Sequence, residues 1–324
     1  MTASQSALRP FLRAPAFWAM AVRAYAYPAS IVPVALGAAY SAYAHRADAA
    51  FRFSWGAFIV ALIAGMLYHT ACNLLNDYYD TKHGVDRPGT YGGSGVMLRG
   101  ELSGREVLGV AYACLALGVL LGICLLLYMY TAYDLQAALT LLIIGVAGAL
   151  GAVFYTTTPG SAKYSALGEP LVFLMMGPGM VLGSYIVLTG TVTWNAVWVS
   201  LPVACIVTAI LHANDTRDIA DDRASGIRTA AILLGPTRAR VLLSALYFAP
   251  YVILLILAAT RIAPWMTLLA LTSFPLMWPL HRLFWTVREE KSEKLKGSVE
   301  NTAKLHLAFG LLMSLGVLLG IWLM

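Results

Sequence analysis

The chain consists mostly of long apolar stretches separated by shorter polar segments. A helix needs roughly 20 apolar residues to cross a bilayer, and nine stretches approach or exceed that length. Their approximate bounds are 17–43, 54–76, 107–130, 135–155, 166–188, 194–213, 241–260, 263–286 and 305–324. None alternates between polar and apolar positions with a period of two, which favours helices over a membrane barrel. The pattern predicts an all-α integral membrane bundle of nine transmembrane helices.

The composition agrees with this prediction. Hydrophobic residues make up 60% of the 324 residues and charged residues 12%, whereas a soluble domain has roughly twice that charged fraction. The sequence contains no low-complexity tract, so we expect a single membrane domain over residues 1–324. The four cysteines lie in or near the apolar stretches without CxxC spacing, which is typical of small buried side chains.

The basic residues predict which way the bundle faces. If the N-terminus is cytoplasmic, 19 of the 22 Lys and Arg residues fall in the N-terminal segment and the inside loops, as the positive-inside rule requires. The net charge of +6 then follows from topology and suits an anionic inner leaflet, so no nucleic-acid partner is needed to explain it. We expect a multi-pass protein of the cytoplasmic (inner) membrane, in contact with membrane lipid.

Acidic residues gather in two windows that the same assignment puts at the cytoplasmic face. The pattern Asn-Asp-x-x-Asp occurs at 76–80 and again at 214–218, each time where an apolar stretch ends. These windows hold seven of the 16 acidic residues, namely Asp77, Asp80, Asp86, Asp215, Asp218, Asp221 and Asp222. Carboxylates so close together repel one another unless cations lie between them. The windows therefore predict metal ions and an anionic ligand that needs them.

Helical spacing puts several of these oxygen ligands on common faces. Residues four apart share one face of a helix, as do Asn76 and Asp80, and likewise Asn214, Asp218 and Asp222. Such hard ligands suit Mg²⁺, which is commonly shared between one or two carboxylates and substrate phosphates. Zinc is disfavoured because no Cys or His cluster accompanies the acids. The candidate metal ligands are Asn76, Asp77, Asp80, Asp86, Asp215, Asp218 and Asp222.

Basic side chains are interleaved with the acids. Lys82 and Arg87 lie in the first window, and Arg217, Arg223 and Arg228 in the second. Taken singly, each is also explained by a salt bridge. Taken together, acids and bases indicate a diphosphate site, in which metals bridge phosphates to Asp and basic groups bind the remaining oxygens. Beside lipid-facing helices, this suggests a polyprenyl diphosphate whose departure Mg²⁺ and the cationic side chains assist.

Five stretches carry a resemblance to a known family: residues 73–86, 92–97, 155–169, 214–229 and 302–310. The first reads Asn-Leu-Leu-Asn-Asp-Tyr-Tyr-Asp-Thr-Lys-His-Gly-Val-Asp and the second Gly-Gly-Ser-Gly-Val-Met. On these stretches the chain resembles the UbiA superfamily of intramembrane prenyltransferases over essentially its whole length. The Gly-Val-Asp86 ending and the stretch from Lys163 to Glu169 are most similar to the MenA type, 1,4-dihydroxy-2-naphthoate polyprenyltransferase.

The resemblance implies nine helices around a central cavity, two Mg²⁺ ions and a lateral opening to lipid. The first metal–diphosphate motif is matched by Asn76, Asp77, Asp80 and Asp86, the second by Asp218 and Asp222 with Asn214 and Asp215 beside them, and basic positions near the diphosphate by Lys163 and Arg228. Near the start of the first helix, on the acceptor side, this branch often carries Arg-Pro-Lys, whereas the chain reads Arg23-Ala24-Tyr25.

Residue patterns and resemblance together give two groups of candidates. The candidate catalytic residues are Asp77, Asp80, Asp218, Asp222, Lys163 and Glu169. The candidate substrate-binding residues are Asn76, Lys82, Arg87, Tyr155, Arg217, Arg228, Asn214 and Arg23.

Four side chains near the two windows have a structural as well as a functional interpretation. Tyr155 is either an aromatic at the membrane interface or a neighbour of the diphosphate. Glu169 either positions or deprotonates the acceptor, or forms a salt bridge with Lys163. His69 and His212 precede the two Asp windows and are predicted to be structural histidines with satisfied ring nitrogens.

Two glycine-rich segments bear on the shape of the site. Residues 177–179, Gly-Pro-Gly, predict a kink in the fifth span, beside three methionines that either line a tail tunnel or pack against lipid. Residues 92–95 are either a hinge that lets Asp86 fold back toward the metals or only a linker.

The sequence as a whole predicts Mg²⁺-dependent transfer of a polyprenyl group from its diphosphate to an aromatic acceptor, by electrophilic attack on carbon. By resemblance, the expected acceptor is dihydroxynaphthoate, on the route to menaquinone, with loss of CO₂ from the attacked carbon. Another acceptor of the same superfamily, a hydroxybenzoate or a chlorin, is the alternative. A divalent-cation transporter is the alternative from another class, and it should carry acids near mid-membrane.

Overall fold

The computed structural model describes residues 14–157, 161–289 and 292–322. Its helices, in chain order, are α2 (Pro15–Ala21), the 3₁₀ turn η2 (Ala24–Ala26), α3 (Pro28–Ala44), α4 (Trp55–Lys82), α5 (Gly104–Ala132), α6 (Leu135–Phe154), α7 (Gly168–Leu174), the π-helical turn η3 (Met175–Gly179), α8 (Met180–Thr189), α9 (Trp194–Arg217), α10 (Ile219–Ala224), α11 (Ala230–Ala259), the 3₁₀ helix η4 (Trp265–Ser273), α12 (Phe274–Thr286), the 3₁₀ turn η5 (Glu293–Leu295) and α13 (Ser298–Trp322). Within the described ranges there is no β-strand, only an isolated bridge between Ser165 and Arg228. The prediction of an all-α fold is confirmed.

The number of spans differs from the expected nine. Seven helices of the described part are long and apolar enough to cross a membrane, or eight if the pair formed by α2 and the segment Ala24–Ala44, bent by 62°, is one span. The predicted span at 263–286 is divided between η4 and α12. Proline at the start of α12 cannot donate a backbone hydrogen bond, so an unbroken apolar pattern does not here give one unbroken helix. The last two residues of the ninth predicted span lie outside the described residues.

Local sequence signals explain where the helices begin and break. Side chains that accept a backbone N–H cap the N-termini of α4, α5, α6, α9 and α11, and they are Ser54, Ser103, Asp134, Thr193 and Thr229. The predicted kink at Gly-Pro-Gly falls inside η3, a single π-helical turn between α7 and α8. Arg23, at the bend between α2 and α3, adopts a left-handed φ of 55°.

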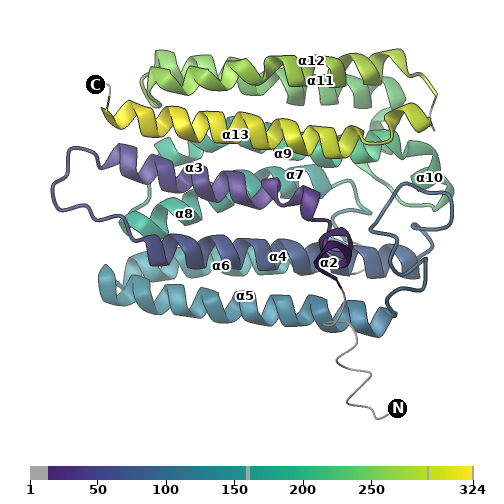
Figure 1. Ribbon diagram of the computed structural model, residues 1–324, viewed down its shortest axis with the longest axis horizontal. Coiled ribbons are helices and arrows are strands. Elements are labelled where there is room, and N and C mark those ends of the chain that lie inside the picture. Colours follow the sequence, from purple (N-terminus) through teal and green to yellow (C-terminus); the bar gives the residue numbers. More distant parts are fainter. Residues whose placement is uncertain (1–13, 158–160, 290–291, 323–324) are drawn as a thin grey trace, which may run out of the picture.

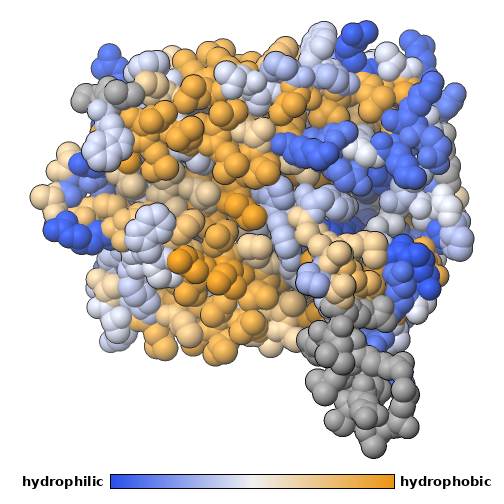
Figure 2. Space-filling view, in the orientation of Figure 1, coloured by the Kyte–Doolittle hydropathy of each residue, from blue (hydrophilic) through white to orange (hydrophobic). Residues whose placement is uncertain are grey.

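The helices form a bundle in which α13 and α9 lie between α11 and α12 on one side and α3, α7 and α8 on the other (Figure 1). Helix α9 packs against α11, α13 and α7, and α13 also packs against α3 and η4. On the other side, α4 packs against α5, with α6 beside it. Figure 2 shows apolar side chains over the middle of the visible face and hydrophilic ones gathered at the end where α10 lies. This belt suits a bilayer, while the direction of crossing stays a prediction.

Candidate active site

The two Asp windows meet at one cavity. Helices α4 and α9 both end at the hydrophilic side of the bundle, and their last turns open on a cavity of about 600 Å³. Its polar wall there includes Arg23, Asn76, Asp80, Asp86, Tyr155, Lys163, Asn214, Asp218, Asp221 and Asp222. Segments separated by more than a hundred residues therefore share a single site, as the paired motifs predicted.

In the first window, Asp80 is the centre of a network. Its carboxylate forms an ion pair with Lys163 Nζ, accepts a hydrogen bond from the Tyr164 hydroxyl at 2.6 Å, and accepts another from Asn76 Nδ2 at 2.9 Å. Asp80 is 1% exposed. Burial lowers the pKa of Lys163, but Asp80 and then Asp222 raise it by more, so the net pKa is above the ordinary value and the ammonium stays charged.

Asp77 lies off the cavity wall and holds other parts of the site in place. Its carboxylate forms an ion pair with Arg23 and accepts hydrogen bonds from the backbone N–H of Ser94, at 3.0 Å, and from the Ser94 hydroxyl. Arg23 also donates to Asn76 Oδ1 at 3.2 Å. Asp77 thus connects the last turns of α4 to the bend before α3, through Arg23, and to the loop after α4, through Ser94. Arg23 itself lines the cavity.

The second window is paired locally. Arg217 donates to both oxygens of Asp218, from Nε at 2.7 Å and from Nη2 at 2.6 Å. Arg217 also donates to Asn214 Oδ1 at 2.9 Å and lies 5.5 Å from the ring centroid of Tyr91. Asp215 is buried off the cavity wall, with Asn214 Nδ2 at 3.5 Å. The predicted ligands Asp77 and Asp215, second in each copy, therefore share a position away from the cavity.

Asp86 and Asp222 fit a hard cation best. Both are buried, both line the cavity, and neither has an ion pair within the described ranges. Burial and then Asp80 raise the pKa of Asp86 to about 6, and burial and then Asp215 raise that of Asp222 to about 8. The Asp86 carboxylate lies against Gly92 and Gly93, where any Cβ would collide with it.

The carboxylates and amides of the site suit a metal ion that takes only some of its ligands from the protein. In the described part of the chain, no three His, Cys, Asp or Glu side chains converge on one metal position. Mg²⁺ requires only one or two protein carboxylates when phosphate oxygens and water complete its shell. The residues present therefore fit Mg²⁺ shared with a phosphate ligand.

Several predicted substrate-binding residues lie away from the cavity wall. Lys82 is exposed, with its Nζ 5.8 Å from the rings of two neighbouring tyrosines. Arg87 donates to Ser225 Oγ at 2.6 Å and to Asp221 Oδ1 at 3.2 Å, so it links the two windows. Arg228 is exposed and lines a second pocket, away from this cavity.

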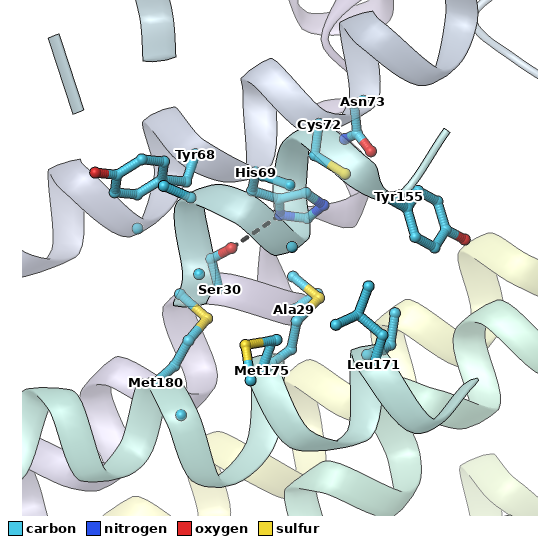
Figure 3. Close-up of a pocket in the computed structure, with 18 of the residues that line it drawn as sticks. Ala29, Ser30, Tyr68, His69, Cys72, Asn73, Tyr155, Leu171, Met175 and Met180 are labelled. Atoms are coloured by element: carbon cyan, nitrogen blue, oxygen red, sulfur yellow. Dashed lines mark hydrogen bonds between the residues drawn. The ribbon is translucent and has the colours of Figure 1, made fainter. Parts of the chain in front are cut away.

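Tyr155 lines the cavity near its polar end (Figure 3). Burial and then Asp215 raise its pKa well above the ordinary value, so its hydroxyl remains a hydrogen-bond donor at neutral pH. This placement favours a role beside the diphosphate over a purely interfacial one.

Glu169 belongs to a separate buried pair. Its Oε1 lies 2.7 Å from His212 Nδ1, and His212 Nε2 lies 2.9 Å from the carbonyl oxygen of Ala239. The salt bridge to Lys163, one of the two alternatives for Glu169, does not form, because Lys163 pairs with Asp80. The prediction that His212 is a satisfied structural histidine is confirmed, and a role of Glu169 at the reacting atoms stays a prediction.

Deeper in the cavity, the structure adds residues that the sequence analysis did not assign to the site. Ser30 on α3 and His69, Cys72 and Asn73 on α4 line one wall (Figure 3). The signal was present in the sequence, because His69, Asn73, Asn76 and Asp80 follow a helical repeat along α4. Opposite them, Met175, Met176 and Met180 line the cavity, which favours a tail tunnel over lipid packing.

Comparisons with known proteins agree with this geometry. The sequence profile of the UbiA prenyltransferase family matches residues 30–307. The chain is 34% identical over 306 residues to mouse UbiA prenyltransferase domain-containing protein 1, covering 94% of this chain and 84% of the relative. It is 29% identical over 297 residues to 1,4-dihydroxy-2-naphthoate octaprenyltransferase of Bacillus subtilis, covering 92% and 90%.

A solved structure is similar in fold. A UbiA homologue from Archaeoglobus fulgidus, bound to GPP and Mg²⁺, superimposes with a TM-score of 0.58 at 16% identity, covering 92% of this chain and 99% of that one. At this level of identity the likeness concerns the arrangement of the helices alone.

Proposed function

The chain belongs to the UbiA prenyltransferase family, and we propose that it transfers a polyprenyl group from polyprenyl diphosphate to 1,4-dihydroxy-2-naphthoate in menaquinone biosynthesis. One observation carries the proposal: both Asp windows open on a single cavity that continues between apolar helices. The diphosphate donor is supported by the homologue bound to GPP and Mg²⁺. The acceptor is supported by the octaprenyltransferase relative, which aligns over nearly the whole chain.

At the polar end, the residues suit a diphosphate bound through divalent cations. Mg²⁺, in two ions by the family resemblance, would be held by Asn76, Asp80, Asp86, Asp218 and Asp222, which all line the cavity. Bound there, Mg²⁺ would stabilise the negative charge of the leaving diphosphate. Lys163 and Arg23 add fixed positive charge, and Tyr155 adds a hydroxyl donor, at the same end.

The rest of the cavity suits the prenyl chain. Its wall on α6, α7 and α8 consists of Leu, Ile, Val, Ala, Gly and Met side chains together with Ser184, whose hydroxyl donates to the backbone oxygen of Val34 at 2.8 Å. Exclusion of water from this region protects the cation until the ring attacks it. The cation forms when the C–O bond electrons leave with the diphosphate, the ring then forms the new C–C bond to it, and the attacked carbon loses CO₂.

We place the reaction at the cytoplasmic face of the inner membrane, following the distribution of basic residues. Another aromatic acceptor remains the alternative, since the relatives at 33–34% identity carry no acceptor in their names. The cation-transporter alternative is set aside because the family consists of prenyltransferases.

An acceptor panel tests the proposal. Purified protein is incubated with Mg²⁺, one long prenyl diphosphate, and dihydroxynaphthoate, 4-hydroxybenzoate or a chlorin, and the products are identified by mass spectrometry. We expect Mg²⁺-dependent prenylation of dihydroxynaphthoate, with a mass showing loss of CO₂. The Asp218→Asn variant serves as the matched inactive protein. Preferential prenylation of either other acceptor would reject dihydroxynaphthoate as the acceptor.

A further inference from the structure

The cavity has two chemically different walls below the Asp windows. One is built from α3 and α4 and carries polar groups, among them Ser30, His69 and Asn73. The other is built from α7, η3 and α8 and presents Leu171, Met175 and Met180 (Figure 3). A prenyl chain gains most from the apolar wall, since burial of apolar surface is favourable. The polar wall is left for a substrate that carries hydroxyl groups.

On the polar wall, His69 has one ring nitrogen that is hydrogen-bonded and one that is not. Its Nδ1 lies 2.8 Å from Ser30 Oγ, and its ring packs edge-on against Tyr27 at 6.1 Å between centroids. Tyr27 is itself fixed by a hydrogen bond of 2.9 Å to Thr70 Oγ1. Within the described residues, His69 Nε2 has no hydrogen-bond partner, and the ring reaches into the cavity (Figure 3). Nδ1 is therefore fixed by Ser30, while Nε2 can form a hydrogen bond with a ligand in the cavity.

The distance from His69 to the diphosphate end suits an aromatic ring system between them. His69 precedes Asn76 by seven residues, which puts both on one face of α4 and separates them by about 10 Å along the helix. A bicyclic acceptor whose attacked carbon lies beside the first prenyl carbon would bring a ring hydroxyl to this depth.

We propose that His69 is the general base that accepts the hydroxyl proton of the aromatic acceptor, and that Ser30 orients it; this rests on the proposed function. Ser30 Oγ accepts the hydrogen bond of Nδ1–H, which leaves the lone pair of Nε2 facing the cavity. The acceptor O–H bond breaks and its proton moves to Nε2. The C–O bond electrons leave with the diphosphate, and the ring, now more electron-rich, forms the C–C bond to the allylic cation. The attacked carbon then loses CO₂ from its carboxylate, which restores the aromatic ring as a phenolate, and this oxygen takes the proton back from Nε2.

The carboxylates of the site are placed for other roles, and Asp86 and Asp222, which line the cavity, are proposed Mg²⁺ ligands at the diphosphate end. Glu169 is bonded to His212 off the cavity wall. Asp80 is bonded to Lys163 and Tyr164 at the diphosphate end. Among the described residues that line the cavity, His69 is the single histidine.

The variant His69→Gln tests the proposal in the acceptor assay described above. It keeps a polar group beside Ser30 but cannot take up a proton at neutral pH. We expect kcat for the acceptor to fall about 10²–10⁴-fold, the usual contribution of a general base, while KM for the prenyl diphosphate is unchanged. The defect should shrink for acceptors with a more acidic hydroxyl, which ionise without a base.

A matched control and a second variant keep the test decisive. His281→Gln is the control, because His281 Nδ1 also lies near a serine, Ser244 at 3.1 Å, but away from the cavity. Ser30→Ala should lower kcat by about threefold to tenfold, as loss of one orienting hydrogen bond does, and it tests the pair if His69→Gln does not fold.

Two outcomes would overturn the proposal, and a third would reject its premise. Normal kcat in both His69→Gln and Ser30→Ala would exclude His69 as the base. A His69→Gln defect of equal size for acceptors of every acidity would indicate a structural role instead. If wild-type protein prenylates no hydroxylated aromatic acceptor, the proposed function itself fails, and this is seen before any variant is made.

Discussion

The two Asn-Asp-x-x-Asp copies have similar sequences but are held together differently. In the first copy, Asp77 and Asp80 take their cations from distant parts of the chain, Arg23 and Lys163. In the second copy, Asp218 takes its cation from the adjacent residue, Arg217. The first copy therefore organises tertiary structure around α4, whereas the second is a locally balanced element at the end of α9.

This difference shows that a repeated motif need not have repeated functions. Both copies supply one Asn and one Asp to the cavity wall, from their first and fifth positions. The second position of the first copy, Asp77, fixes a loop and a helix bend. Loss of a carboxylate should thus affect catalysis in both copies but folding chiefly in the first.

The largest effect is expected from Asp80→Asn compared with Asp218→Asn. Each should lower Mg²⁺-dependent turnover by about 10²–10³-fold, because each removes charge that positions the diphosphate. Each also leaves a buried cation without its carboxylate, Lys163 at 10% and Arg217 at 5% exposed, at a cost of about 3 kcal/mol or more. Only Asp80 joins distant segments through its partners, Lys163 and Tyr164. In Asp218→Asn, Arg217 can still donate a hydrogen bond to Asn214 Oδ1.

Turnover of prenyl diphosphate and the thermal unfolding midpoint in detergent check this pair of variants. Asp80→Asn should melt well below Asp218→Asn, with both nearly inactive. Equal melting temperatures would remove the structural distinction between the copies, and normal turnover in either would remove that residue from the site.

A smaller difference between the two windows should appear in the pH dependence of Mg²⁺ affinity. The pKa of Asp222 is raised to about 8 and that of Asp86 to about 6, and both carboxyls must lose a proton to bind Mg²⁺. Apparent Mg²⁺ affinity should therefore rise with pH, being at least about tenfold weaker at pH 6 than at pH 8. Most of this change should come from the second window.

Magnesium titrations of turnover between pH 6 and 8 measure this dependence. Asp222→Asn should flatten it, whereas Asp86→Asn should leave the rise toward pH 8 in place. A dependence that is unchanged in Asp222→Asn would show that this carboxyl is not among the Mg²⁺ ligands.

The convergence of the two windows could be predicted from the sequence because it follows from helix period and from the ends of the apolar stretches. The identity of the ion-pair partners could not. Arg23 reaches Asp77 only through the bend between α2 and α3, where its own φ is 55°. Glu169 follows Lys163 by six positions in the sequence, but in the folded chain Lys163 forms its ion pair with Asp80, and Glu169 is bonded to His212.

The role of single side chains was hardest to predict where one pattern fits two environments. His69 and His212 both precede an Asp window, and both were expected to be structural. Both ring nitrogens of His212 are hydrogen-bonded. His69 faces the cavity, and among the described residues its Nε2 has no hydrogen-bond partner. The difference arises from which face of each helix meets a neighbour, which depends on tertiary packing that short-range patterns do not contain.

The smallest effect is expected at the contact that joins the two copies. Arg87 in the first window donates to Asp221 and Ser225 in the second, and the Arg87 side chain is 37% exposed. A partly exposed pair contributes about 1 kcal/mol or less, so Arg87→Ala should raise KM for the prenyl diphosphate by only about threefold to fivefold. Arg99→Ala is the matched control, because Arg99 pairs with Glu101 inside the same loop and is 46% exposed. A larger KM effect for Arg99→Ala would mean that the order of the first loop, and not its link to the second window, determines substrate affinity.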